Sequence, residues 1–303
     1  EDVTSVDSVG IVTARGLSIF GNTTGLQVAS GISTFQAITA TTIVSSSTIN
    51  GLSVGKGLNS VATNTTVGSG ALDANTTGSN NAVLGYNGAT ANTTGQNNTA
   101  VGSVSFATNT TGSQNTAVRM GALDANTTAS NNTALGYSAL LSNTTGAQNT
   151  AVGHLALDAN TTGNTNTAVG YQALTANTTA NYNIAVGVYA LKTNTTGTRN
   201  VAMGHAALED CSTVSDNTAI GYGVLRNLTT GSVNSGVGAN CLDACTTGIR
   251  NAAFGYDAMT ANTTGGQNVA MGAYALAGNT TANDCVAIGY DCLSQANAGA
   301  SNN

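Results

Sequence analysis

The feature that most constrains this chain is a repeat of 17 residues without gaps. NTALGYSAL, NTAVGHLAL and NTAVGYQAL begin at residues 132, 149 and 166, and NTAIGYGVL and NVAMGAYAL begin at 217 and 268. The unit is written N-T-T-G-x-x-N-T-A-V-G-Y-x-A-L-x-A, with unit positions 1 to 17. Fourteen copies then run without insertion from residue 58 to residue 295. A gapless repeat indicates that each copy is one structural layer stacked on the previous one.

The residues of the unit favour strands over helices. Helical repeats are mostly about 33 to 47 residues long, and Gly, Asn and Thr are poor helix formers. The run T-A-V-G-Y alternates between two sides as a short strand does, and N-T-T-G is typical of a turn. The sequence therefore predicts an all-β protein, a parallel β-solenoid (β-roll) of about 14 rungs with 17 residues per rung. At about 4.8 Å per rung the coil would be roughly 65 Å long.

Four unit positions have a predicted structural role. Position 10 is always apolar and position 15 is usually Leu, so both are expected to stack inside the coil. Asn at position 7, present in 13 of 14 copies, is expected to form a hydrogen-bonded ladder. Gly at position 11, also in 13 of 14 copies, joins Ala at position 9 in a smooth face that we expect to pack against an identical chain. The residues singled out for these ladders and stacks are Asn115, Asn132, Asn149, Asn166, Asn183, Asn200, Gly136, Gly153, Gly170, Val152, Val169, Leu157 and Leu174.

The repeat resembles two kinds of surface fibre. N-T-A-V-G at 149–153 and 166–170, with N-T-T-G between copies, is similar to the head repeats of trimeric autotransporter adhesins of the YadA type, which read N-S-V-A-I-G-x-x-A. That family's unit is shorter, and this chain adds an N-T-T-type turn. Similar 17-residue repeats occur in fibre proteins of tailed phages, notably those of marine cyanobacteria. Over residues 58–295 the resemblance implies a left-handed parallel β-roll in a homotrimeric rod.

The two ends of the chain lie outside the repeat. Residues 1–57 are off register, and SVDSVGIVTARGLSIFG and SGISTFQAITATTIV are similar to the shaft segments of such fibres. We therefore expect an N-terminal β-rich stem or shaft over 1–57, the solenoid over 58–295 and a polar tail over 296–303.

Composition and motif spacing argue against several functions. Only 7% of the residues are charged and the net charge is −6, so no basic patch marks a nucleic-acid partner, and no run of about 18 apolar residues indicates membrane insertion. The only histidines, His154 and His205, share position 12 three rungs apart, and acidic residues at position 16 never stand on neighbouring rungs. The five Cys contain no C-x-x-C pair. We expect no enzyme activity, no cofactor and no metal site, and buried structural cysteines.

The function expected from these features is mechanical. The resemblance implies a rigid spacer on a virion or in the extracellular space that attaches to a host or surface, possessing identical chains as partners and a cell-surface receptor or glycan as a further candidate partner. Whether it serves a phage fibre or a cell-surface adhesin stalk stays open. Two further alternatives come from the N-T-T triplets: an ice-binding Thr array, and N-x-T glycosylation sequons. We favour a buried turn ladder for the sequon asparagines.

Overall fold

The computed structural model describes residues 47–49, 52–57, 59 and 61–295, in which there are sixteen β-strands. β1 (Ser47–Ile49) and β2 (Leu52–Gly55) pair antiparallel, and β2 pairs antiparallel with β3 (Thr65–Val67). The chain divides into two compact units, residues 1–43 and 44–303. Residues 1–46 and 296–303 lie outside the described residues, so most of the predicted stem and all of the predicted tail remain predictions.

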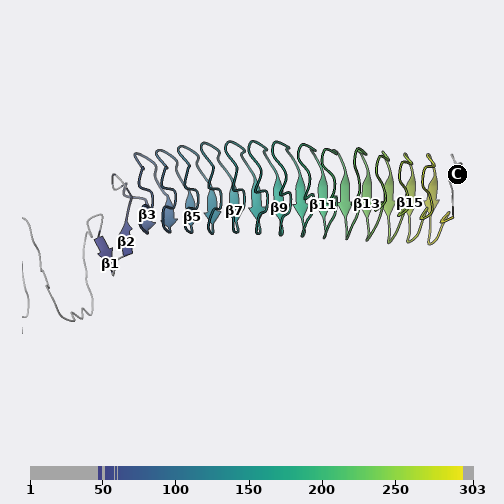
Figure 1. The fold of residues 1–303 in the computed structure, drawn as a ribbon, viewed down its shortest axis with the longest axis horizontal. Helices are drawn as coiled ribbons and strands as arrows, with labels where there is room; N and C mark the ends of the chain where they lie inside the picture. Colours follow the sequence, from purple (N-terminus) through teal and green to yellow (C-terminus); the bar gives the residue numbers. More distant parts are fainter. Residues whose placement is uncertain (1–46, 50–51, 58, 60, 296–303) are drawn as a thin grey trace, which may run out of the picture. The chain divides into compact units, whose positions relative to one another are not determined.

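From β3 onward each copy of the repeat contributes one three-residue strand, and the strands pair in chain order (Figure 1). All pairs from β3 to β16 are parallel and equivalent residues lie side by side; Thr150 pairs with Thr167, for example. The predicted parallel β-solenoid with 17 residues per rung is therefore confirmed. The later strands are β4 Ala82–Leu84, β5 Thr99–Val101, β6 Thr116–Val118, β7 Thr133–Leu135, β8 Thr150–Val152, β9 Thr167–Val169, β10 Ile184–Val186, β11 Val201–Met203, β12 Thr218–Ile220, β13 Ser235–Val237, β14 Ala252–Phe254, β15 Val269–Met271 and β16 Val286–Ile288.

The middle residue of each strand faces the interior of the coil. Ala151 and Ala168, at position 9, are fully buried, whereas Val152 and Val169, at position 10, are only half-buried. The prediction that Val152 and Val169 stack inside the coil is therefore wrong. The face formed by position 9 is also not available to an identical chain, because it lines the interior of its own coil. The physical reason is space: a rung of 17 residues encloses a narrow interior, in which a column of Ala fits beside a column of Leu.

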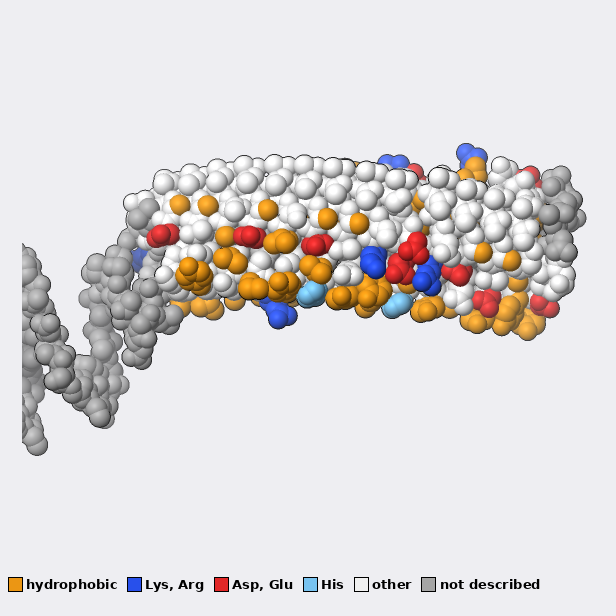
Figure 2. Space-filling view, in the orientation of Figure 1, with side chains coloured by type: hydrophobic (Ala, Val, Ile, Leu, Met, Phe, Trp, Pro, Cys, Tyr) orange, Lys and Arg blue, Asp and Glu red, His pale blue; other side chains and the backbone are white. Residues whose placement is uncertain are grey.

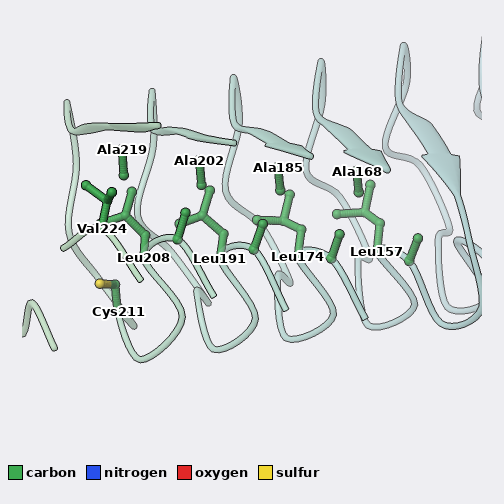
Figure 3. Close-up of a cluster of buried hydrophobic side chains, with 14 of the residues drawn as sticks. Leu157, Ala168, Leu174, Ala185, Leu191, Ala202, Leu208, Cys211, Ala219 and Val224 are labelled. Atoms are coloured by element: carbon green, nitrogen blue, oxygen red, sulfur yellow. The ribbon is translucent and has the colours of Figure 1, made fainter. Parts of the chain in front are cut away.

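The core is a stack of small and medium side chains repeated on every rung (Figure 3). Leu157, Leu174 and Leu191, at position 15, point toward Ala168, Ala185 and Ala202 in the strands. Position 14 adds another small buried side chain, such as Ala156 or Ala173. The predicted Leu stack, including Leu157 and Leu174, is confirmed as buried.

Each rung turns its corners with left-handed backbone. Gln148 (φ 61°), Leu155 (φ 55°) and Leu157 (φ 54°), at positions 6, 13 and 15, all have positive φ although none is glycine. The Gly of N-T-T-G does not: Gly146 and Gly163 are absent from the positive-φ residues. The corners were expected at N-T-T-G, but the left-handed residues lie elsewhere in the unit.

Gly at position 11 is required by both conformation and space. Gly136 (φ 148°), Gly153 (φ 139°) and Gly170 (φ 137°) adopt a backbone that L side chains rarely adopt. A Cβ at Gly153 would also overlap the carbonyl oxygen of Gly170 on the next rung. The close approach predicted for these glycines is real, but it is made between successive rungs of one chain.

Candidate functional surface

The asparagines at position 7 hold adjacent rungs together. The Oδ1 atom of Asn149 accepts the backbone N–H of Asn166 at 2.9 Å, and its Nδ2 donates to the carbonyl of Gly163 at 2.8 Å. The same arrangement recurs along the coil, and these side chains are almost completely buried. The predicted ladder through Asn115, Asn132, Asn149, Asn166, Asn183 and Asn200 is present, with the difference that its most regular bonds join side chain to backbone rather than amide to amide.

A second ladder runs through the asparagines at position 1, the first residue of N-T-T-G. Asn160 donates from Nδ2 to Oδ1 of Asn143 at 2.8 Å, and Asn177 donates in turn to Asn160 at 2.8 Å. Each also donates to a carbonyl three residues along, as Asn160 does to Gly163. These are the sequon asparagines, and Asn143, Asn160 and Asn177 are fully buried. Their side chains are therefore inaccessible in the folded coil, as the turn-ladder interpretation required.

This second ladder stops where cysteine replaces asparagine. Cys211 occupies position 1 directly after Asn194, and Asn194 Oδ1 is the buried side-chain polar atom left without a hydrogen bond among the described residues. Burial raises the pKa of the Cys211, Cys241 and Cys245 thiols, for Cys241 to about 12 and for Cys245 to about 11. No disulfide joins the cysteines of the described residues.

The two threonines of N-T-T-G have different surroundings. At position 2, Thr144 donates its hydroxyl to the carbonyl of Thr161 at 3.0 Å, and the column continues in this way. At position 3, Thr145 and Thr162 are exposed. Of the two columns, therefore, only position 3 presents its hydroxyls to solvent along the coil.

An apolar stripe runs along the outer face of the strands. It consists of the exposed large apolar side chains at positions 8, 10, 12 and 13, and Figure 2 shows a row of hydrophobic side chains along one edge of the coil. Positions 8, 10 and 12 carry no Asp, Glu, Lys or Arg in any copy. The members are Leu84, Tyr86, Met120, Leu135, Tyr137, Tyr171, Ile184, Val188, Met203, Ile220, Tyr222, Phe254, Tyr256, Met271, Tyr274, Val286, Ile288 and Tyr290.

The aromatic rings of this stripe contact one another from rung to rung. His154 stacks between Tyr137 and Tyr171, with ring centroids 5.2 and 5.4 Å apart, and the row continues through Tyr189, His205 and Tyr222. Both histidines are therefore part of an aromatic row and lie in separate layers. No group of three or more His, Cys, Asp or Glu that could hold a metal ion occurs within the described ranges.

The charged side chains lie apart from the stripe's strand columns and form local pairs. Lys192, Glu209, Arg226 and Asp243 occupy position 16 on four successive rungs with alternating sign. Arg226 Nε lies 3.4 Å from Glu209 Oε2, and Lys192 Nζ lies 4.6 Å from the centre of the Tyr189 ring. Such pairs are partly exposed and each stabilises the coil only modestly.

The geometry defines the class of protein as a parallel β-solenoid with a 17-residue rung. No family model, no curated protein and no solved structure matches the chain in the comparisons made. No helix in the described part of the chain is long and apolar enough to cross a membrane.

Proposed function

We propose that this chain is a non-enzymatic structural fibre segment on a virion or cell exterior, where it acts as a rigid spacer and helps attach the particle or cell to a surface. The observation that carries the proposal is the continuous bonding between rungs. Each of the central rungs is joined to the next by a parallel strand, by two Asn side chains and by a Thr hydroxyl. A coil bonded in this way at every layer is stiff along its axis, as a spacer must be.

The partners in this proposal are identical chains, three to a rod, with a cell-surface receptor or glycan at the attachment step. The support is the resemblance of N-T-A-V-G to repeats of trimeric fibres, together with the long apolar stripe. Three copies of a repetitive surface raise the effective concentration of each weak contact, so modest affinity for a receptor suffices. The proposal requires no cofactor, no nucleic acid and no insertion of this segment into a membrane.

Multi-angle light scattering combined with negative-stain electron microscopy tests this function. The expected result is a particle of three chain masses with an elongated, unbranched outline. A compact monomer at micromolar concentration would contradict the proposal. Binding of the particle to the surface of candidate host cells, compared with a chain lacking several central rungs, would then test the attachment step.

One observation favours a second candidate, an ice-binding surface. The position 3 threonines present exposed hydroxyls in register on successive rungs, as Thr145 and Thr162 do. Thermal hysteresis of the purified chain distinguishes the two candidates. The fibre proposal predicts none, and hysteresis that is lost when Thr145 and Thr162 are replaced by Lys would favour ice binding.

A further inference from the structure

The outer face of the parallel sheet is the least explained surface of the described coil. Parallel sheets occur almost only where both faces are covered. Here the inner face packs on the Ala and Leu core, whereas Leu135, Met203 and Phe254 on the outer face are 43%, 41% and 39% exposed. Monomeric proteins rarely expose apolar patches larger than a few hundred Å².

The stripe is large enough to form a stable interface. Each half-exposed Tyr of the stripe leaves roughly 100 Å² of ring surface uncovered. With the aliphatic side chains of position 10 added, the stripe offers on the order of 1,000 Å² per chain, above the ~800 Å² per partner of a standard interface. No formal charge at positions 8, 10 or 12 opposes its burial.

The period of the stripe identifies the partner. Its side chains recur once per rung over the strands from β4 to β16, so a partner that covers it must present complementary side chains at the same spacing. A second copy of this chain has that spacing by construction. We therefore propose that the apolar stripe is the contact between copies of this chain in the fibre, which rests on the proposed function and specifies its interface.

The residues at position 8 indicate the direction of pairing. They are Thr on the five successive rungs from Thr99 to Thr167, whereas Ile184, Val201, Val269 and Val286 are apolar and lie in the C-terminal half. In a parallel arrangement in register, apolar rungs face apolar rungs and Thr faces Thr. An antiparallel arrangement would place the apolar half of one copy against the Thr half of the other. The copies therefore run parallel and in register.

Single-cysteine crosslinking of the full chain tests the contact. Val152→Cys places a thiol in the stripe, and Thr145→Cys places one on an exposed corner of the same copy. Under mild oxidation Val152→Cys is expected to give a reductant-sensitive crosslinked dimer in denaturing gels, and Thr145→Cys and the unmodified chain are expected to give none. The unmodified chain also controls for its own five cysteines.

A second pair of variants tests the direction. Val101→Cys and Phe254→Cys are each expected to crosslink with themselves. Crosslinking only after the two variants are mixed would overturn the parallel arrangement. Val152→Asp is expected to dissociate the particle while its far-ultraviolet circular dichroism is retained.

The failure of this interface and the failure of the fibre function give different results. If the chain is oligomeric by light scattering but Thr145→Cys crosslinks and Val152→Cys does not, the stripe is not the contact and the fibre proposal survives. If the chain is monomeric at all concentrations and neither variant crosslinks, both proposals are wrong.

Discussion

Asn149 and Asn166 are linked across one rung by a hydrogen bond of 2.9 Å from the backbone N–H of Asn166 to Oδ1 of Asn149. The same Asn149 side chain donates to the carbonyl of Gly163 at 2.8 Å. One buried amide therefore satisfies a backbone donor and a backbone acceptor that face the coil interior, where no water is at hand. Repetition of this unit explains how a chain so poor in charge and in large aromatic side chains forms an ordered coil.

Replacing Asn149 by Ala is expected to lower the free energy of unfolding by about 2–4 kcal/mol. The substitution removes both bonds and leaves a buried N–H and a buried C=O unpaired, each at a cost of ~1–3 kcal/mol. Chemical denaturation of the variant measures the loss. Gln148→Ala, at the exposed neighbouring residue, is the matched control and should change stability by less than about 0.5 kcal/mol. Equal stability of the two variants would show that the ladder contributes little.

The glycine column predicts opposite effects at two of its positions. Gly153→Ala is expected to destabilise by ~2 kcal/mol or more, because the new Cβ meets the Gly170 carbonyl in a backbone region that disfavours L side chains. Arg119 occupies the same unit position with φ 94°, so Arg119→Gly is expected to stabilise by about 1 kcal/mol. Thermal unfolding of both variants checks the signs. A stabilising Gly153→Ala would contradict the close approach of the rungs.

The carboxyl group of Asp124 makes stability depend on pH. Burial raises the pKa of Asp124, and its neighbours at position 16 are Ala107 and Leu141, which supply no counter-charge. Because the folded-state pKa lies above the unfolded value, the stability linked to this group is fully present below the unfolded pKa and is lost as pH rises through the folded pKa.

Asp124→Asn should therefore raise the melting temperature at pH 7 relative to the unmodified chain. The advantage should shrink as the pH falls toward 3, where the Asp124 carboxyl is itself protonated. Melting curves of both chains across this range give the comparison. A variant that is less stable than the parent at pH 7 would show that the carboxylate makes a favourable contact.

The left-handed corner at position 6 predicts a stabilising glycine. Gln148 has φ 61° and an exposed side chain, so Gln148→Gly removes conformational strain at little cost in packing. A gain of about 0.5–1 kcal/mol is expected, whereas Gln148→Ala keeps the strain and gains nothing. Denaturant titration of the two variants side by side isolates the backbone effect, and a loss of stability in the glycine variant would argue against a left-handed corner.

The rung length was predictable because the repeat has no insertions, and the Leu157–Leu174 stack because position 15 is almost always Leu. The alternation in T-A-V-G-Y correctly placed Ala151 and Val152 on opposite sides of the strand. It could not show which side is inside, since alternation is unchanged when the strand is turned over. Hydrophobicity favoured Val152, but the space left beside Leu157 accommodates only Ala151.

The second Asn ladder was missed for a related reason. Asn143 and Asn160 lie in N-T-T-G, whose composition is typical of an exposed turn, and their burial depends on the corner that brings position 1 into the interior. The available signal was regularity: Asn at position 1 recurs in nearly every copy, whereas an exposed turn residue tolerates exchange. The left-handed conformations of Leu155 and Leu157 had no signal in residue type at all.

Deletion of one complete period tests the central claim, that each 17-residue copy is one interchangeable layer. Removing residues 150–166 joins Asn149 to Thr167 and preserves every column, whereas removing residues 150–158 breaks all of them. Small-angle X-ray scattering of the full-period variant is expected to show an unchanged cross-section and a length reduced by about 4.8 Å, with circular dichroism retained, while the shorter deletion disrupts the coil. If the full-period deletion disrupts folding as severely as the nine-residue deletion, the copies are not equivalent layers and the account is wrong.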